Sequence, residues 1–141
     1  MHVPRARARV PTVFKTTLIV RFGDLDPAGV AYYPNLVHYL HIAFEDFFSG
    51  HLGRSYPAVI AEGLGFPTVK LEMEYETPVR YGEPLDITVA VEHVGRTSMH
   101  VRYEGRVGDR IAFRARNVVV AVNLKTFEKT SIPDWLRTRL Q

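Results

Sequence analysis

One segment of this chain has the apolar spacing of a long helix, whereas most of the remainder has the composition of β-strands. From Pro34 onward, apolar residues recur at steps of three and four, namely at Leu36, Leu40, Ala43, Phe44, Phe47 and Phe48. Pro34 suits the first helical position because its missing N–H would have no partner there. Gly50 or Gly53 is expected to end the helix. The phenylalanines give this helix a large apolar face, which the rest of the chain must cover.

Strand-forming segments lie on both sides of the predicted helix. Residues 13–22 are rich in β-branched and aromatic types, and from Val69 to Glu76 apolar and charged residues alternate, as in a sheet with one wet face. Further strands are predicted at 85–94, 98–107 and 111–122, the last two joined by a turn at Gly108-Asp109. Short helical pieces are predicted at 55–62 and after Pro133. The pattern indicates an α+β fold in which an antiparallel sheet of about five strands wraps around one long central helix.

The length and composition favour one compact domain over residues 1–141, without a linker. Its 141 residues, 46% of them hydrophobic, are enough to bury a single core. Residues 1–9 carry Arg5, Arg7 and Arg9 and are expected to form a solvated basic tail, with a transit peptide or a nucleic-acid arm as alternatives. No apolar run approaches the roughly 18 residues of a membrane span, so no membrane partner and a cytoplasmic location are expected.

The absence of cysteine limits the kinds of site that the chain can form, and its net charge bears on the partners that it can bind. A chain with no cysteine has no disulfide, no thiol nucleophile and no cysteine-ligated metal. The net charge of +3 suits a polyanion, and both coenzyme A (CoA) and nucleic acid are polyanions, so charge alone does not choose between them.

The stretch from Arg21 to Asn35 places a carboxylate just before the predicted helix. Within it, Asp26-Pro27-Ala28-Gly29 matches a type I turn. The first backbone N–H groups of a helix lack partners and carry partial positive charge, so they can polarise a carbonyl and stabilise an oxyanion. A carboxylate beside such groups can attack the carbonyl or activate water. The loop therefore indicates acyl transfer.

Residues Gly23 to Gly29 and Tyr33 to Asn35 resemble the signature of the hotdog-fold thioesterases, most closely the 4-hydroxybenzoyl-CoA thioesterase type. The order of strand, helix and four strands agrees over nearly the whole chain. The resemblance implies hydrolysis of an acyl-CoA thioester without a cofactor. It implies that Asp26 is the catalytic carboxylate, as nucleophile or general base, and that Tyr33 supplies the backbone N–H to the thioester carbonyl. The alternative for Asp26 is a purely turn-forming aspartate. Asp24 is expected to brace the loop.

A second segment, Val94 to Ser98, resembles a Gly-Arg-x-Ser-like turn of the same family. The resemblance implies that Arg96, with Thr97 and Ser98, binds substrate, and that the guanidinium contacts the CoA phosphates. An exposed turn arginine is the alternative. Lys70 and Arg80 are weaker candidates for the same role.

One helix position departs from the family pattern. His41 aligns with an aspartate that contacts the phenolic hydroxyl in the 4-hydroxybenzoyl type, so the acyl group is expected to be aromatic or short-chain, with its identity open. His38, His41 and Glu45 share one helical face, which also permits a metal interpretation. No flanking motif supports a metal, and we expect His41 to bind substrate.

The family forms dimers and often tetramers, so the resemblance implies a homodimer or homotetramer with the site at the subunit interface. Three alternatives to an acyl-CoA thioesterase stay open at this point. They are an acyl-carrier-protein thioesterase, a non-catalytic module that binds acyl thioesters, and a nucleic-acid-binding domain that uses the basic tail. No nucleic-acid partner is expected under the leading interpretation.

Overall fold

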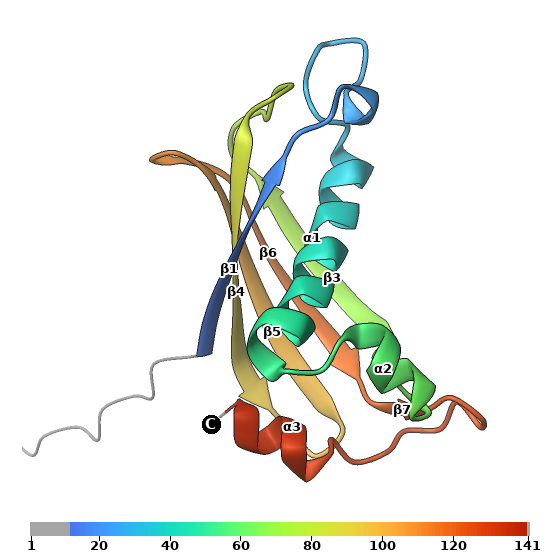
Figure 1. Ribbon diagram of the computed structural model, residues 1–141. Coiled ribbons are helices and arrows are strands. Elements are labelled where there is room, and N and C mark those ends of the chain that lie inside the picture. Colours follow the sequence, from blue (N-terminus) through green and yellow to red (C-terminus); the bar gives the residue numbers. More distant parts are fainter. Residues whose placement is uncertain (1–11, 141) are drawn as a thin grey trace, which may run out of the picture.

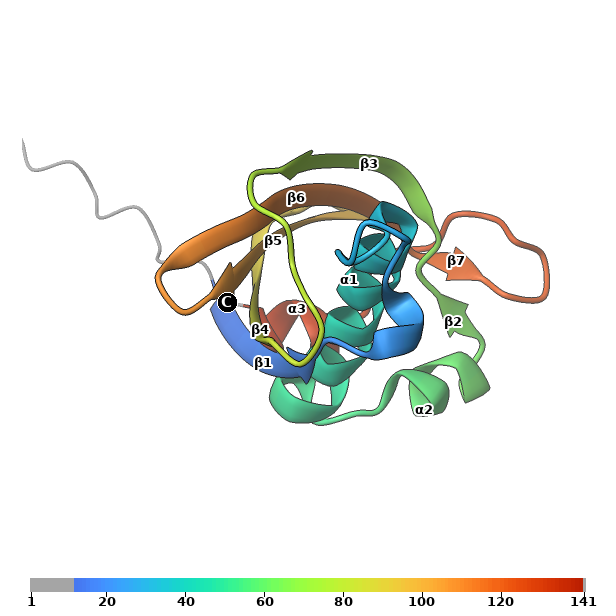
Figure 2. The same ribbon diagram turned by 90° about the horizontal axis from the view of Figure 1, so that it is seen from above.

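Five strands form one antiparallel sheet in the computed structural model, which describes residues 12–140. The predicted basic tail of residues 1–9 lies outside the described residues. The strands are β1 (Thr12–Ile19), β3 (Thr68–Tyr75), β4 (Pro84–Val94), β5 (Ser98–Val107) and β6 (Arg110–Val120). They lie in the order β1-β4-β5-β6-β3, so that β1 and β3 form the two edges. The sheet curls around the long helix α1 (Tyr33–Phe47), as predicted (Figures 1 and 2).

The shorter elements cover the end of the sheet away from the start of α1 (Figure 1). Helix α1 continues as a π-helical turn (Phe48–Leu52) and ends at Gly53, whose φ of 77° is left-handed. Helix α2 (Tyr56–Ala61) follows, capped by the Ser55 side chain. A small sheet then pairs β2 (Leu64–Gly65) with β7 (Val122–Asn123), and α3 (Asp134–Arg139) closes the chain.

Helix α1 packs tightly against β1 and β4. Phe47 is fully buried, and its ring lies 5.9 Å from that of Phe14 on β1. Gly50 leaves room for this approach, because a Cβ there would lie 2.7 Å from the Phe14 ring and the ring would have to shift. Gly53 therefore ends the helix, and Gly50 serves the packing of helix against sheet.

Two predicted strands differ from the observed ones at their ends. The first strand stops at Ile19 instead of continuing to residue 22, because the chain turns into a 3-10 helix at Phe22–Asp24. The last long strand stops at Val120, since the Ala121 N–H donates to the Thr97 carbonyl and the chain then pairs with β2. The first change follows from a local turn, whereas the second depends on a partner distant in sequence.

The inner face of β3 is only partly covered by α1. Leu71 and Tyr75 point to the same side as the buried residues of β6, yet they are 40% and 46% exposed. The outer face of β3 carries Lys70, Glu72 and Glu74, which pair with residues of β6. This is the solvent-exposed face that the alternation predicted. A groove therefore runs between α1 and β3, and two hollows lie along it.

Candidate active site

Asp26 lies in a tight turn at the end of the groove where α1 begins. The Gly29 N–H donates to the Asp26 carbonyl at 2.9 Å, and Gly29 has a φ of 81°. The Ala28 N–H donates to Asp26 Oδ1 at 2.8 Å. Asp26 thus has the turn-forming role, but Oδ2 accepts no hydrogen bond from residues 12–140. One carboxylate oxygen fixes the loop, and the other takes no part in the hydrogen bonds of the turn.

Asp24 holds this loop against α1. Its carboxylate accepts a 2.5 Å hydrogen bond from the Tyr39 hydroxyl, and its carbonyl accepts from the Tyr32 N–H and from the Asn35 side chain, both at 2.9 Å. Burial, together with the neighbouring Asp24 carboxylate, raises the pKa of Tyr39 to about 12. Asp24 therefore braces the loop, as the sequence predicted.

Counting only acceptors in residues 12–140, the first turn of α1 leaves one backbone donor unpaired at the hollow that Asp26 lines. The Tyr32 N–H is used by Asp24, and the Asn35 N–H donates to the Tyr32 carbonyl. Pro34 has no N–H. The Tyr33 N–H has no acceptor within the described part of the chain, and it lies at the positive end of the helix dipole.

Asp26 and Tyr33 line the same hollow. Its other walls come from Leu36 on α1 and from the end of β3 and the segment after it, where Tyr75, Glu76 and Thr77 lie. The Tyr33 and Tyr75 rings are 6.2 Å apart in an edge-to-face arrangement. A carboxylate and a free N–H donor at one concave site can bind and attack a carbonyl.

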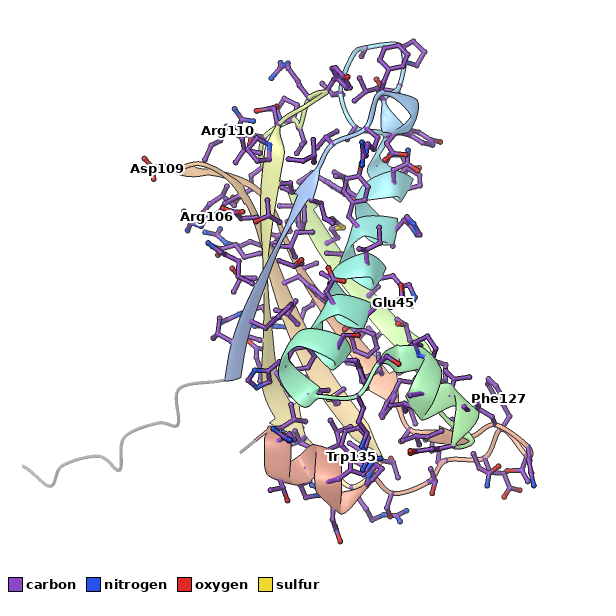
Figure 3. All side chains as sticks on the ribbon, in the orientation of Figure 1. Glu45, Arg106, Asp109, Arg110, Phe127 and Trp135 are labelled. Atoms are coloured by element: carbon purple, nitrogen blue, oxygen red, sulfur yellow. The ribbon has the colours of Figure 1, made fainter. Side chains whose placement is uncertain are left out.

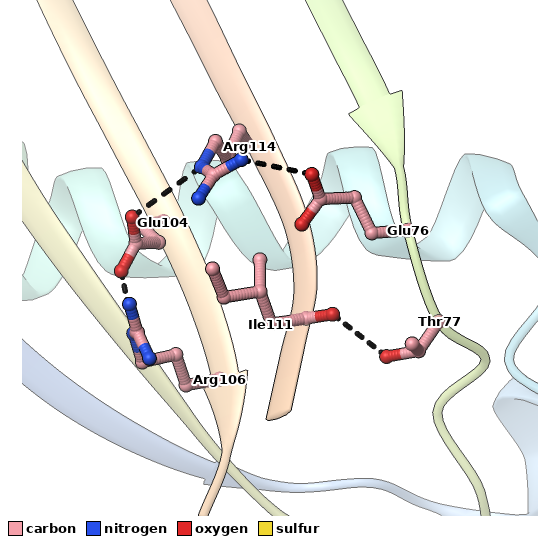
Figure 4. A network of polar contacts seen from close by, with 6 residues as sticks. All are labelled: Glu76, Thr77, Glu104, Arg106, Ile111 and Arg114. Atoms are coloured by element: carbon pink, nitrogen blue, oxygen red, sulfur yellow. Dashed lines mark hydrogen bonds and ion pairs between the residues drawn. The ribbon is translucent and has the colours of Figure 1, made fainter. Parts of the chain in front are cut away.

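An ion-pair network holds the β3 side of this hollow (Figure 4). Arg114 donates to Glu76 at 2.8 Å and lies 3.6 Å from Glu104, which accepts in turn from Arg106 at 2.6 Å. The hydrogen bond from Arg106 lowers the pKa of Glu104. The Thr77 hydroxyl donates to the Ile111 carbonyl at 2.7 Å. These contacts fix the chain where it leaves β3.

His41 lines the second hollow, farther along the groove. Val37, Leu40 and Phe44 of α1 form one wall, and Leu71 of β3 forms another. The His41 side chain is 53% exposed, and its Nε2 lies 3.7 Å from Glu45 Oε2. Within residues 12–140, no three His, Cys, Asp or Glu side chains are placed to hold a metal ion.

The turn with Arg96, Thr97 and Ser98 lies at the opposite end of the sheet. It joins β4 to β5 beside α3, whereas the Asp26 loop is at the other end of β4 (Figure 1). Arg96 donates to the Ser131 hydroxyl at 3.3 Å. An 11-residue strand spans about 35 Å. One chain therefore brings Asp26 and Tyr33 together but keeps Arg96, Thr97 and Ser98 far from them.

Residues 20–140 match the family model described as the Thioesterase-like superfamily. The chain belongs to this superfamily. The predicted resemblance to hotdog thioesterases and the predicted class of thioester hydrolases are thereby confirmed. The hotdog fold is confirmed as well, both by this match and by the solved structures that the thioesterase-like chain resembles.

The relatives of this thioesterase-like chain include enzymes named for one aromatic substrate. A 1,4-dihydroxy-2-naphthoyl-CoA hydrolase from Prochlorococcus marinus (strain MIT 9303) is 28% identical over 125 residues, which cover 82% of each chain. The enzyme of that name from Thermosynechococcus vestitus is 29% identical and covers 84% of this chain and 85% of its own. The 1,4-dihydroxy-2-naphthoyl-CoA thioesterase from Synechocystis superimposes with a TM-score of 0.84 at 22% identity, over 92% of this chain and 96% of its own.

The sequence pattern of this thioesterase-like chain predicted only part of the site. It did not place Tyr75, Glu76 or Thr77 beside Asp26. Tyr75 continues the apolar alternation of β3, which was the available signal for an inward side chain.

Among the described helices, none is both long and apolar enough to cross a bilayer.

Proposed function

We propose that this chain hydrolyses the thioester of an aromatic or short-chain acyl-CoA. The observation that carries the proposal is the hollow lined by the Asp26 carboxylate and by Tyr33, whose N–H has no acceptor among residues 12–140. The names of the relatives support an aromatic acyl group, because both sequence relatives act on a hydroxynaphthoyl-CoA by name.

In the proposed reaction, the thioester carbonyl oxygen accepts a hydrogen bond from the Tyr33 N–H. The start of α1 stabilises the negative charge that grows on that oxygen during attack. Asp26 Oδ2 acts in one of two ways. As a general base it takes a proton from water while the hydroxide adds to the carbonyl carbon, and the C–S bond then breaks to release the CoA thiolate. As a nucleophile it adds directly, expels the thiolate and forms an anhydride that water hydrolyses.

We propose further that a second copy of the chain completes the CoA site. Within one chain, the Arg96 turn is too distant to reach a substrate whose thioester lies at Asp26. Strand β3 is an open edge of eight residues, with Val69 62% exposed and Tyr75 46% exposed. Such an edge presents unpaired backbone N–H and C=O groups, which can pair with a strand of another chain. A homodimer or homotetramer would cover this edge and bring Arg96, Thr97 and Ser98 of a neighbour to the coenzyme.

The first experiment measures release of free thiol from a panel of aromatic and aliphatic acyl-CoA esters. Asp26→Asn keeps an oxygen for the Ala28 N–H but removes the carboxylate charge. We expect kcat/KM to fall by about 10²- to 10⁴-fold or more. The matched control is Asp109→Asn, which makes the same change at the exposed tip of the β5–β6 turn and should keep native activity (Figure 3).

The outcomes separate the remaining functions. Turnover by Asp26→Asn at the native rate would refute the catalytic role of Asp26. Binding of CoA esters without turnover by either protein would support a non-catalytic module. Failure of free CoA to compete, with turnover only of carrier-protein esters, would support the acyl-carrier-protein alternative. An active monomer in light scattering would refute the shared CoA site.

A further inference from the structure

The second hollow has a polar floor beneath apolar walls. Thr68 of β3, Tyr103 of β5 and Asn117 of β6 line it, opposite Leu40 and Phe44 of α1. Tyr103 is only 1% exposed. Asn117 Nδ2 donates to the Thr68 hydroxyl at 3.3 Å, whereas Asn117 Oδ1 is buried and has no hydrogen-bond partner in the part of the chain that the structure describes.

An unpaired oxygen at this position is unusual for a protein interior. Most buried polar atoms have a partner, because an unmade hydrogen bond leaves the cost of removing the atom from water without compensation. Burial raises the pKa of Tyr103 more than the neighbouring Asn117 amide lowers it, so this phenol is neutral and keeps its O–H donor.

This polar floor and the hollow lined by Asp26 and Tyr33 lie at different positions along the same groove. Asn117 pairs with Leu71 across β3 and β6, and Tyr75 lies four residues farther along β3 beside Tyr33. Four residues of strand span about 13 Å. An acyl group of one or two aromatic rings, with a hydrogen bond at each end, covers this separation. Its rings would then lie against the apolar side chains that form the walls.

We propose that Asn117 and Tyr103 determine acyl specificity by binding a hydroxyl group on the far edge of an aromatic acyl group. The hydroxyl donates to Asn117 Oδ1 and accepts from the Tyr103 O–H. An acyl group without this hydroxyl would leave the Asn117 oxygen both unpaired and cut off from water, which disfavours it. His41 is half-exposed at the rim of the hollow. Asn117 and Tyr103, more than His41, therefore discriminate between acyl groups with and without the hydroxyl.

This inference rests on the proposed thioesterase function, and its test compares matched esters. Each pair consists of a hydroxyaroyl-CoA and the same aroyl-CoA without the ring hydroxyl, in the benzoyl and naphthoyl series. We expect the native protein to prefer one hydroxylated ester by about 10- to 100-fold in kcat/KM. Asn117→Leu should remove this preference, mainly by raising KM for the hydroxylated ester while kcat is kept. Tyr103→Phe should reduce the preference in part.

The ester without the hydroxyl serves as the internal control, because a merely misfolded variant would lose activity on both members of a pair. Equal loss on both esters, or no native preference for any hydroxylated ester, would overturn the proposal. Loss of the preference in His41→Ala with retention in Asn117→Leu would do the same.

A binding measurement keeps this test independent of catalysis. Calorimetric titration of the free hydroxyaroic acid and its parent acid compares the same two ligands without turnover. If the native protein hydrolyses no ester, the thioesterase proposal fails. The floor is then still tested by whether the native protein binds the hydroxy acid more tightly and Asn117→Leu does not.

Discussion

The two sides of helix α1 differ in how completely the sheet covers them. Toward β1 and β4, aromatic rings fill the space, and Phe47 is inaccessible to solvent. Toward β3, the groove stays open, and the inward residues Leu71 and Tyr75 keep 40% and 46% of their surface. The packed side stabilises the fold, since dense contacts between apolar side chains are what a core contributes. The open side leaves a concave apolar surface with a few polar groups, which is the usual composition of a ligand site.

The largest effect on stability is expected on the packed side. Phe47→Ala removes a fully buried ring that contacts Phe14 and Phe48. We expect the free energy of unfolding to fall by about 3 to 5 kcal/mol, because the surrounding strands cannot close the cavity. Urea denaturation followed by circular dichroism measures this loss. A change below about 1 kcal/mol would mean that the two sides of α1 do not differ as described.

An intermediate effect is expected where α1 holds the Asp26 loop. Tyr39→Phe removes the hydroxyl that donates to Asp24 and leaves that carboxylate without this partner. We expect a loss of about 1.5 to 3 kcal/mol in the free energy of unfolding, the range for hydrogen bonds to charged groups. The same denaturation experiment applies, and an unchanged midpoint would show that the contact does not stabilise the loop.

The same residue predicts a pH dependence. The ordinary pKa of tyrosine is about 10, and in the folded protein the pKa of Tyr39 is raised to about 12. Above pH 10 the unfolded chain releases this proton before the folded chain does, so the stabilisation is complete below pH 10 and is lost as the pH rises toward 12. Native stability should fall over this interval more steeply than that of Tyr39→Phe. Parallel curves for the two proteins would contradict the assignment.

The smallest effect is expected on the open side. Val37 is half-buried and lines the second hollow. Val37→Ala removes two methyl groups from a wall that already borders open space, so we expect at most about 1 kcal/mol of lost stability. The change should be seen instead as a shift in preference toward bulkier aromatic esters. A loss as large as that of Phe47→Ala would show that the groove side is part of the packed core.

Much of the fold and part of the site were predictable because their signals are local. The steps of three and four in α1, the alternation in β3, and the Gly108-Asp109 turn follow from residues near one another in sequence. Asp26 and Tyr33 are only seven residues apart, so a turn followed by a helix start is enough to bring them to one hollow. The break after Val120 was missed, since it depends on a hydrogen bond from the Ala121 N–H to the distant Thr97 carbonyl.

The sequence by itself determined the central helix, the strands around it and the loop that carries Asp26, because periodicity, turn residues and helix starts act over a few residues. Only the tertiary structure decided which side of α1 stays open, that Tyr75 and Glu76 face Asp26, and that Asn117 lies beside Tyr103 beneath the groove. These depend on strand order and register across the sheet, which join residues that are far apart along the chain. The separation of Arg96 from Asp26 has the same origin, since β4 lies between them along its whole length.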